Sequence, residues 1–149
     1  MHDSTSRQFV WRLFPLGNAA CLTITLENGH ILELELGESQ ISSLKVLQAR
    51  RSLDDADPLK PPIVKGWRGP DRFAKLVGDD HGYPLGIEAI RKCLRKLRQA
   101  IAALVRAIDK DMQPPPLIEC GRNKKGYRLA DNVVLIIFPP DQLADDDPS

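Results

Sequence analysis

The stretch "PPPLIECGRNKKGYRLADN", residues 114–132, determines how the C-terminal part of this chain folds. Its three leading prolines cannot continue a helix, because proline lacks a backbone N–H and restricts the residue before it. The apolar pieces "LIECG" and "GYRLA" then flank a polar loop, a pattern that predicts a β-hairpin over residues 117–130. Arg122, Lys124 and Lys125 give the tip of this hairpin a positive charge.

A long amphipathic helix is expected immediately before the prolines. Aliphatic residues recur there at spacings of three and four, and at about 100° per residue they form one stripe. The stripe consists of Ile87, Ile90, Leu94, Leu97, Ile101, Leu104 and Ile108. Basic residues such as Arg91 and Arg95 fall on the opposite side, so the spacing predicts a helix over 86–108 with a basic outer face.

The N-terminal part reads as an antiparallel sheet. Residues 20–26 and 31–36 alternate apolar with polar side chains, which is typical of half-buried strands. Asn28-Gly29 between them is a strong hairpin signal. With the apolar run at 9–14, we expect a meander of about three strands.

Two shorter helices should follow the sheet. Residues 40–51 carry a helical apolar pattern, with Ser39 as the expected N-cap. A polar, proline-bearing loop is expected at 52–62. Pro70 suits the first turn of the next helix, and the turn-rich residues 78–86 should form a loop before the long helix.

Length and composition fit one globular domain. The chain has 149 residues, of which 42% are hydrophobic and 28% charged. The last apolar strand is expected at 132–138 and is followed by two prolines. We therefore predict a flexible N-terminus at 1–8, one domain at 9–138, and an acidic disordered tail at 139–149.

Charge is unevenly distributed, although the net charge is only +1. The segment 85–130 carries 11 lysines and arginines against 4 acidic residues, a local charge of +7. The segment 141–149 carries four aspartates and no basic residue. This asymmetry predicts a basic face and an acidic tail.

Cysteine usage favours a reducing compartment. The three cysteines are far apart and form no CxxC pair, so a cytoplasmic location is expected. The first residues contain no apolar run of signal-peptide length, and no apolar window approaches 18 residues. We therefore expect no membrane partner.

The order of elements resembles the OmpR/PhoB-type winged-helix DNA-binding domain of bacterial response regulators. Three stretches carry the resemblance: "LENGHILELELGESQISSLKVLQA" (26–49), "IRKCLRKLRQAI" (90–101) and "PPLIECGRNKKGYRLA" (115–130). The third stretch is the most specific, since Gly126-Tyr127-Arg128-Leu129 is similar to the second strand of the family's wing. No receiver domain precedes these stretches, so no phosphoacceptor aspartate is implied.

The resemblance implies an α+β fold: a winged helix-turn-helix with an N-terminal antiparallel sheet, three helices and a C-terminal β-hairpin wing. It also implies sequence-specific binding of double-stranded DNA, and regulation of transcription. The helix at 86–108 would enter the major groove, where arginine and glutamine can bond base edges, while lysines meet phosphates. The expected DNA contacts are Arg91, Lys92, Arg95, Lys96, Gln99, Arg122, Asn123, Lys124, Lys125 and Arg128.

A protein-interaction or dimerisation module that does not bind DNA is the alternative. The apolar stripe continues to Ile108, further than a recognition helix needs, so a homodimer through residues 100–112 is a second expectation. The acidic tail could also cover the basic face, as a mimic of DNA would. Tyr127 is expected to be a core anchor under the wing.

No enzyme signature is found in the sequence, and we expect no catalytic residue, metal or cofactor. The Gly-rich phosphate loops GxGxxG and GxxxxGK[ST] are both absent. Asp79-Asp80-His81 reads as a polar turn before the long helix rather than as a metal site. Cys93 lies among basic residues but at the edge of the apolar stripe, which favours a buried, unreactive thiol.

Overall fold

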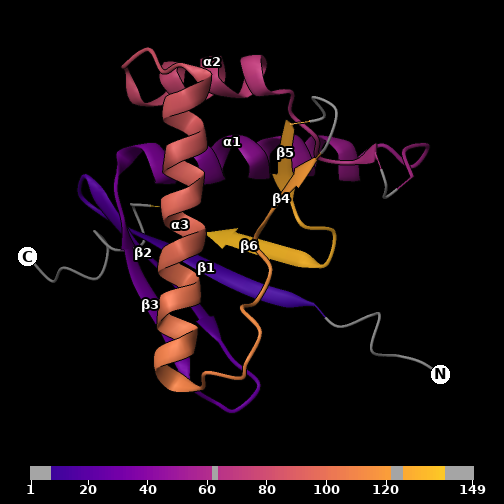
Figure 1. Cartoon of the computed structure of the whole chain (residues 1–149). Coiled ribbons are helices and arrows are strands. Elements are labelled where there is room, and N and C mark those ends of the chain that lie inside the picture. Colours follow the sequence, from indigo (N-terminus) through magenta and orange to yellow (C-terminus); the bar gives the residue numbers. More distant parts are fainter. Residues whose placement is uncertain (1–7, 62–63, 122–125, 140–149) are drawn as a thin grey trace, which may run out of the picture.

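A computed structural model describes residues 8–61, 64–121 and 126–139 of the chain (Figure 1). Its elements are β1 (Phe9–Leu16), β2 (Ala19–Thr25), β3 (Ile31–Leu36), α1 (Glu38–Asp55), α2 (Pro70–His81), α3 (Ile87–Ile108), β4 (Ile118–Gly121), β5 (Gly126–Leu129) and β6 (Val133–Ile137). The expected α+β class with three helices and a C-terminal hairpin is confirmed. Almost all of the predicted N-terminal segment and acidic tail lies outside the described residues.

The larger sheet is mixed rather than purely antiparallel. Its strand order is β3-β2-β1-β6. The predicted meander of β1, β2 and β3 is confirmed, with antiparallel pairs such as Leu13↔Leu22 and Leu22↔Leu34. The predicted last strand is also present, but it pairs parallel to β1, from Phe9↔Val133 to Leu13↔Ile137. The sequence assigned this last strand no partner, and its parallel pairing is what makes the sheet mixed.

One face of this sheet forms the floor of the core. Trp11, Leu13, Leu22 and Leu32 on alternate strand positions are fully buried, as the period of two requires. Helices α1 and α3 cover this face and α2 packs against them, with α3 running along the front of the molecule in Figure 1. None of the helices within the described residues has both the length and the apolar character to cross a bilayer.

Helix α1 begins earlier and ends later than its sequence pattern suggested. Gly37, not Ser39, is the N-cap, because the Gln40 side chain accepts the Gly37 backbone N–H at 3.2 Å. At the other end the helix continues to Asp55. Ion pairs at spacing i,i+4, Arg50 to Asp54 and Arg51 to Asp55, support this extra turn.

Helix α2 also runs one turn further than expected, to His81. Gly78 lies in this extra turn and carries no Cβ; one built there would lie 2.7 Å from the carbonyl oxygen of Tyr83. The following loop can therefore fold back closely against the helix. Gly82 ends the helix in the left-handed conformation, with φ of 90°.

Candidate nucleic-acid interface

Helix α3 buries its apolar stripe in the core. Ile90, Leu94, Leu97 and Ile101 are at most 3% exposed. Val105, which lies outside the predicted stripe, is also buried. This confirms the predicted orientation of the helix and fixes which of its sides faces water.

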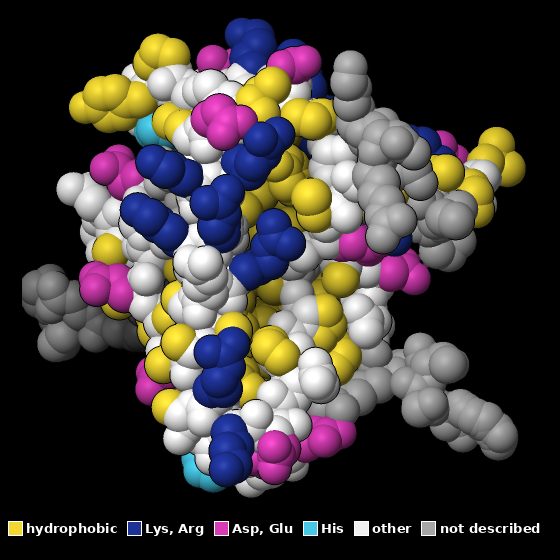
Figure 2. Space-filling view, in the orientation of Figure 1, with side chains coloured by type: hydrophobic (Ala, Val, Ile, Leu, Met, Phe, Trp, Pro, Cys, Tyr) yellow, Lys and Arg dark blue, Asp and Glu magenta, His cyan; other side chains and the backbone are white. Residues whose placement is uncertain are grey.

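The opposite side of α3 is a row of exposed polar and basic side chains. Figure 2 shows lysine and arginine side chains gathered over the N-terminal half of α3. We call this surface the basic face of α3. It consists of the five predicted helix positions together with Arg98, all of them exposed: Arg91, Lys92, Arg95, Lys96, Arg98 and Gln99.

Arg98 was missing from the sequence-based set, although its spacing could have placed it there. It follows Arg95 by three residues, so the two side chains lie on neighbouring positions of the helix surface. The predicted exposure of the other five positions is confirmed. Their contact with DNA stays a prediction.

Within the described residues, most charges on the basic face have no acidic partner. Arg91 forms an exposed ion pair with Glu88, with 2.6 Å between Nη1 and Oε1. Across the part of the chain that the structure describes, Lys92, Arg95 and Lys96 have no ion-pair partner. Exposed ion pairs such as Arg91–Glu88 contribute little to stability. The cations of this face are therefore able to bind an anion.

The hairpin is anchored to the start of α2. The pairing of β4 with β5 runs from Ile118↔Leu129 to Gly121↔Gly126. On its other edge, β5 exchanges two hydrogen bonds with Arg68: the backbone N–H of each residue, Arg68 and Tyr127, donates to the carbonyl of the other at 2.9 Å. The hairpin therefore has a fixed position relative to the helices.

Gly126 is required by this close approach. Its φ is +96°, and a Cβ built on it would lie 1.7 Å from the Arg68 carbonyl oxygen. No side chain fits there without moving the backbone. Close packing against Arg68 therefore explains the glycine in the Gly-Tyr-Arg-Leu sequence.

Arg51 of α1 ties the hairpin to the rest of the fold. Its guanidinium donates to the carbonyl oxygens of Asp131 at 2.7 Å and of Ala130 and Val133 at 3.2 Å. These carbonyls belong to the turn between β5 and β6 and to the first residue of β6. Sequence reasoning assigned Arg51 no such role, since it had placed the end of the helix at this position.

Tyr127 is a core residue, as predicted. It is 5% exposed, and its ring lies 5.3 Å from that of Phe73, centroid to centroid. The four predicted contacts at the hairpin tip lie outside the described residues: Arg122, Asn123, Lys124 and Lys125.

Arg128 corrects the predicted set of DNA contacts. It is only 7% exposed, and its Nε lies 3.0 Å from a carboxylate oxygen of Glu119. Its Nη1 donates to the Lys65 carbonyl at 3.1 Å, and its guanidinium carbon lies 4.6 Å from the centre of the Trp67 ring. Arg128 therefore holds the hairpin against the preceding loop and is not a free surface cation.

Asp54 has a structural role that the sequence did not reveal, because its pattern placed this residue in a surface loop. Its carboxylate accepts hydrogen bonds from the Lys60 ammonium at 2.8 Å and the Gly66 backbone N–H at 2.7 Å. Burial opposes ionisation, but these bonds and the charge of Arg50 outweigh it, so the pKa of Asp54 lies below its usual value. The loop that leads to Arg68 is held by this carboxylate.

Within the described residues, no cluster of histidine, cysteine and acidic side chains could hold a metal ion. Asp80 of the predicted polar turn instead accepts a hydrogen bond from the Ser42 hydroxyl at 2.7 Å. Burial raises the pKa of the Cys93 thiol despite the Ser43 hydrogen bond and the Lys96 charge. Both observations agree with structural roles for Asp80 and Cys93.

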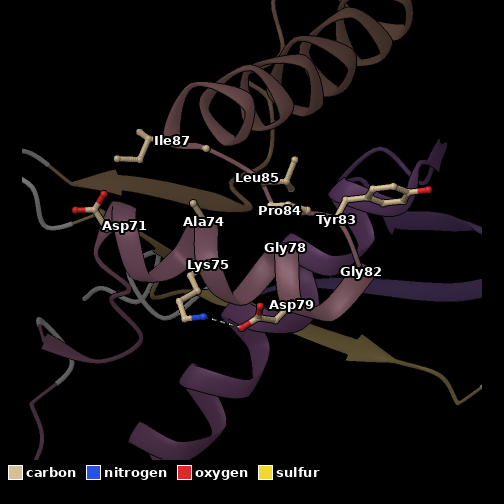
Figure 3. A pocket seen from close by; sticks show the side chains of 11 residues that line it. Asp71, Ala74, Lys75, Gly78, Asp79, Gly82, Tyr83, Pro84, Leu85 and Ile87 are labelled. Atoms are coloured by element: carbon tan, nitrogen blue, oxygen red, sulfur yellow. Dashed lines mark ion pairs between the residues drawn. The ribbon is translucent and has the colours of Figure 1, made fainter.

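A hollow of about 700 Å³ lies between α2 and the loop that leads into α3 (Figure 3). Its charged side chains include Asp71, Lys75 and Asp79, and Lys75 pairs with Asp79 at 3.5 Å. Tyr83 extends away from it at one end. The hollow offers no convergent reactive groups, so we assign it no chemistry.

The C-terminal half of α3 exposes less apolar surface to solvent than its sequence suggested. Leu104 and Ile108 pack against the core, partly buried. Between α3 and residues 114–118 an apolar groove of about 290 Å³ remains, with Leu97 and Ile101 on its helix side. Most of the stripe is thus covered within one chain, which weakens the case for a dimer through 100–112; the dimer stays a prediction.

Comparison of the chain with family models, with curated proteins and with solved structures found no match in any of the three.

Proposed function

We propose that this protein is a winged-helix protein that binds double-stranded DNA and regulates transcription. The basic face of α3 would enter the major groove, and the hairpin β4–β5 would act as the wing. The observation that carries this proposal is the row of exposed cations on α3, largely unpaired within the described residues, opposite a mostly buried apolar stripe.

Physical chemistry supports this use of the face. An α-helix fits the major groove, and lysines and arginines that neutralise phosphates release condensed counterions. Arg95 and Gln99 lie one turn apart on the exposed side and are of the types that bond base edges in pairs. Lys92 and Lys96 are suited to phosphates on either side.

The hairpin supports the proposal through its rigid attachment. Hydrogen bonds to Arg68 and the carbonyl contacts of Arg51 hold β5 against α1 and α2. Residues 122–125 join its two strands and carry three basic side chains. A cationic tip on a fixed support is what a wing needs to contact the neighbouring backbone.

Lysine footprinting tests the proposal directly. The full-length protein is acylated with and without excess duplex DNA at low salt, and mass spectrometry measures the rate at each lysine. We expect duplex DNA to protect Lys92 and Lys96, while Lys110 beyond the end of α3 and Lys45 on α1 react as before. Acylation rates that duplex DNA leaves unchanged at all four lysines, or protection of Lys45 and Lys110 alone, would reject the proposed interface.

A further inference from the structure

The basic face of α3 is a helix face without a partner in the structure, and the chain itself carries a segment of opposite charge. Residues 140–149 contain four aspartates and no basic residue: Asp141, Asp145, Asp146 and Asp147. All four lie within eight positions of Pro139, the last residue that the structure describes. Charge complementarity therefore links this segment to the face.

The structure fixes where this segment starts. β6 is parallel to β1, and β3 also runs parallel to β1 because two antiparallel pairs separate them. All three strands end at the same end of the sheet. The Phe138 backbone N–H donates to the Leu13 carbonyl at 3.0 Å, and the Phe138 ring stacks on that of Phe14 at 4.5 Å.

That end of the sheet leads to the basic face of α3. Gly37 follows β3 directly and starts α1. A hollow of about 600 Å³ lies beside it, between the N-cap and first residues of α1 (37–40) and Lys92, Cys93 and Lys96 of α3. The end of β6 and the two lysines thus belong to the same side of the molecule.

The segment is long enough to reach the lysines. From β6 to β3 the path crosses three strand spacings, about 14 Å in total. Asp145 to Asp147 lie six to eight residues beyond Pro139, a distance of up to about 20–26 Å in an extended chain. Asp145, Asp146 and Asp147 can therefore extend past β3 toward Lys92 and Lys96, and the amino end of α1 adds a partial positive charge.

We propose that residues 140–149 occupy the basic face of α3 when DNA is absent, and that duplex DNA displaces them. The competition rests on the proposed function, whereas the contact itself does not. Aspartate carboxylates take the positions of phosphates beside Lys92 and Lys96. The contact is between charges near the surface, so it weakens as salt rises.

Zero-length cross-linking tests the contact without DNA. A carbodiimide joins a carboxylate to a lysine amine only where the two touch, and mass spectrometry identifies the linked residues in the monomeric full-length protein. We expect links from the tail aspartates to Lys92 or Lys96 at low salt, and their loss at high salt. Links only to Lys45, Lys75 or Lys110, or none at all, would overturn the proposal.

Duplex affinity tests the competition. Asp141→Asn, Asp145→Asn, Asp146→Asn and Asp147→Asn are combined in the full chain. If the tail covers the face about nine-tenths of the time, affinity at low salt should rise about tenfold, and the two proteins should converge at high salt. The matched control removes four exposed acids elsewhere: Glu33→Gln, Glu35→Gln, Asp109→Asn and Asp111→Asn.

The outcomes separate the two proposals. An equal gain in the control would show a general charge effect and overturn the competition. If the wild type and the four-aspartate variant bind duplex DNA equally well, the competition is also overturned, but the proposed function stays intact. If neither binds duplex DNA at low salt, the proposed function is wrong and the competition falls with it, whatever the cross-links show.

Discussion

Asp54 shows how one side chain can hold a long connection in place. Its carboxylate joins the end of α1 to Lys60 and Gly66, and so shapes the loop that delivers Arg68 to the edge of β5. Sequence patterns could not place it, because an aspartate followed by a second one and a proline-bearing stretch is typical of a solvated loop. The i,i+4 spacing of Arg50-Asp54 and Arg51-Asp55 was the one available signal.

Asp54→Asn should lower the free energy of unfolding by about 1.5–3 kcal/mol at pH 7, as hydrogen bonds to charged groups do. The folded pKa of Asp54 is below its usual value, so its stabilisation is present above an unfolded pKa of about 3.9 and is lost as pH falls through the folded pKa. Urea unfolding from pH 7 to pH 3 measures this. A difference between wild type and variant that stays constant over this range would contradict the assignment.

Tyr127 is expected to be a stability residue rather than a base-stacking one. Tyr127→Ala should lower the free energy of unfolding by about 3 kcal/mol, because it leaves a cavity beside Phe73. Tyr83→Ala is the matched control: this ring is 67% exposed, and the change should stay within about 0.5 kcal/mol. Thermal and urea unfolding compare the two, and equal effects would mean that Tyr127 is not packed as described.

At the scale of elements, the hairpin and α3 are held by different means. α3 is fixed by its apolar stripe, which the sequence shows plainly. The hairpin is fixed by hydrogen bonds to Arg68 and Arg51, residues about 60 and 80 positions away, and no local pattern reveals these. This is why Arg128 was misassigned: its exposure depends on Trp67 and Glu119, not on its neighbours in sequence.

Gly126→Ala tests the close approach of the hairpin to the start of α2. It should destabilise the protein by at least about 1–3 kcal/mol, the cost of a strained backbone, because the methyl group also meets the Arg68 carbonyl. Gly17→Ala has a similar φ of +67° but nothing within 4 Å of the added Cβ. Urea unfolding should show a larger loss for Gly126→Ala; equal losses would argue against the contact.

The tip of the hairpin should act on affinity and not on folding. Replacing Arg122, Lys124 and Lys125 together by alanine should weaken binding to all duplexes by a similar factor, since counterion release does not depend on sequence. The melting temperature should be unchanged within error. Fluorescence anisotropy with several unrelated duplexes measures the factor, and a loss confined to one sequence would mean that the tip reads bases.

At the scale of the whole molecule, periodicity predicted much of the fold. The meander, the three helices, the hairpin and the last strand follow from local alternation, turn residues and the spacing of the α3 stripe. The parallel pairing of β6 with β1 does not, because it joins residues more than 100 positions apart and either sheet edge could accept such a strand. The exposure of five helix positions of the candidate site was likewise predictable, while the burial of Arg128 was not.

The proposed interface requires that the N-terminal half of α3 contacts DNA phosphates and bases. The most direct test is the slope of log affinity against log salt for duplex DNA, measured for the wild type and two double variants. Arg95→Ala with Lys96→Ala changes the basic face of α3. Arg106→Ala with Lys110→Ala removes two equally exposed cations near the other end of the helix.

We expect the Arg95/Lys96 variant to lose about two units of slope, one per cation removed, together with affinity at every salt concentration. The Arg106/Lys110 variant should keep the wild-type slope. Equal slopes in all three proteins, or a loss confined to the Arg106/Lys110 variant, would contradict the claim that this face binds DNA.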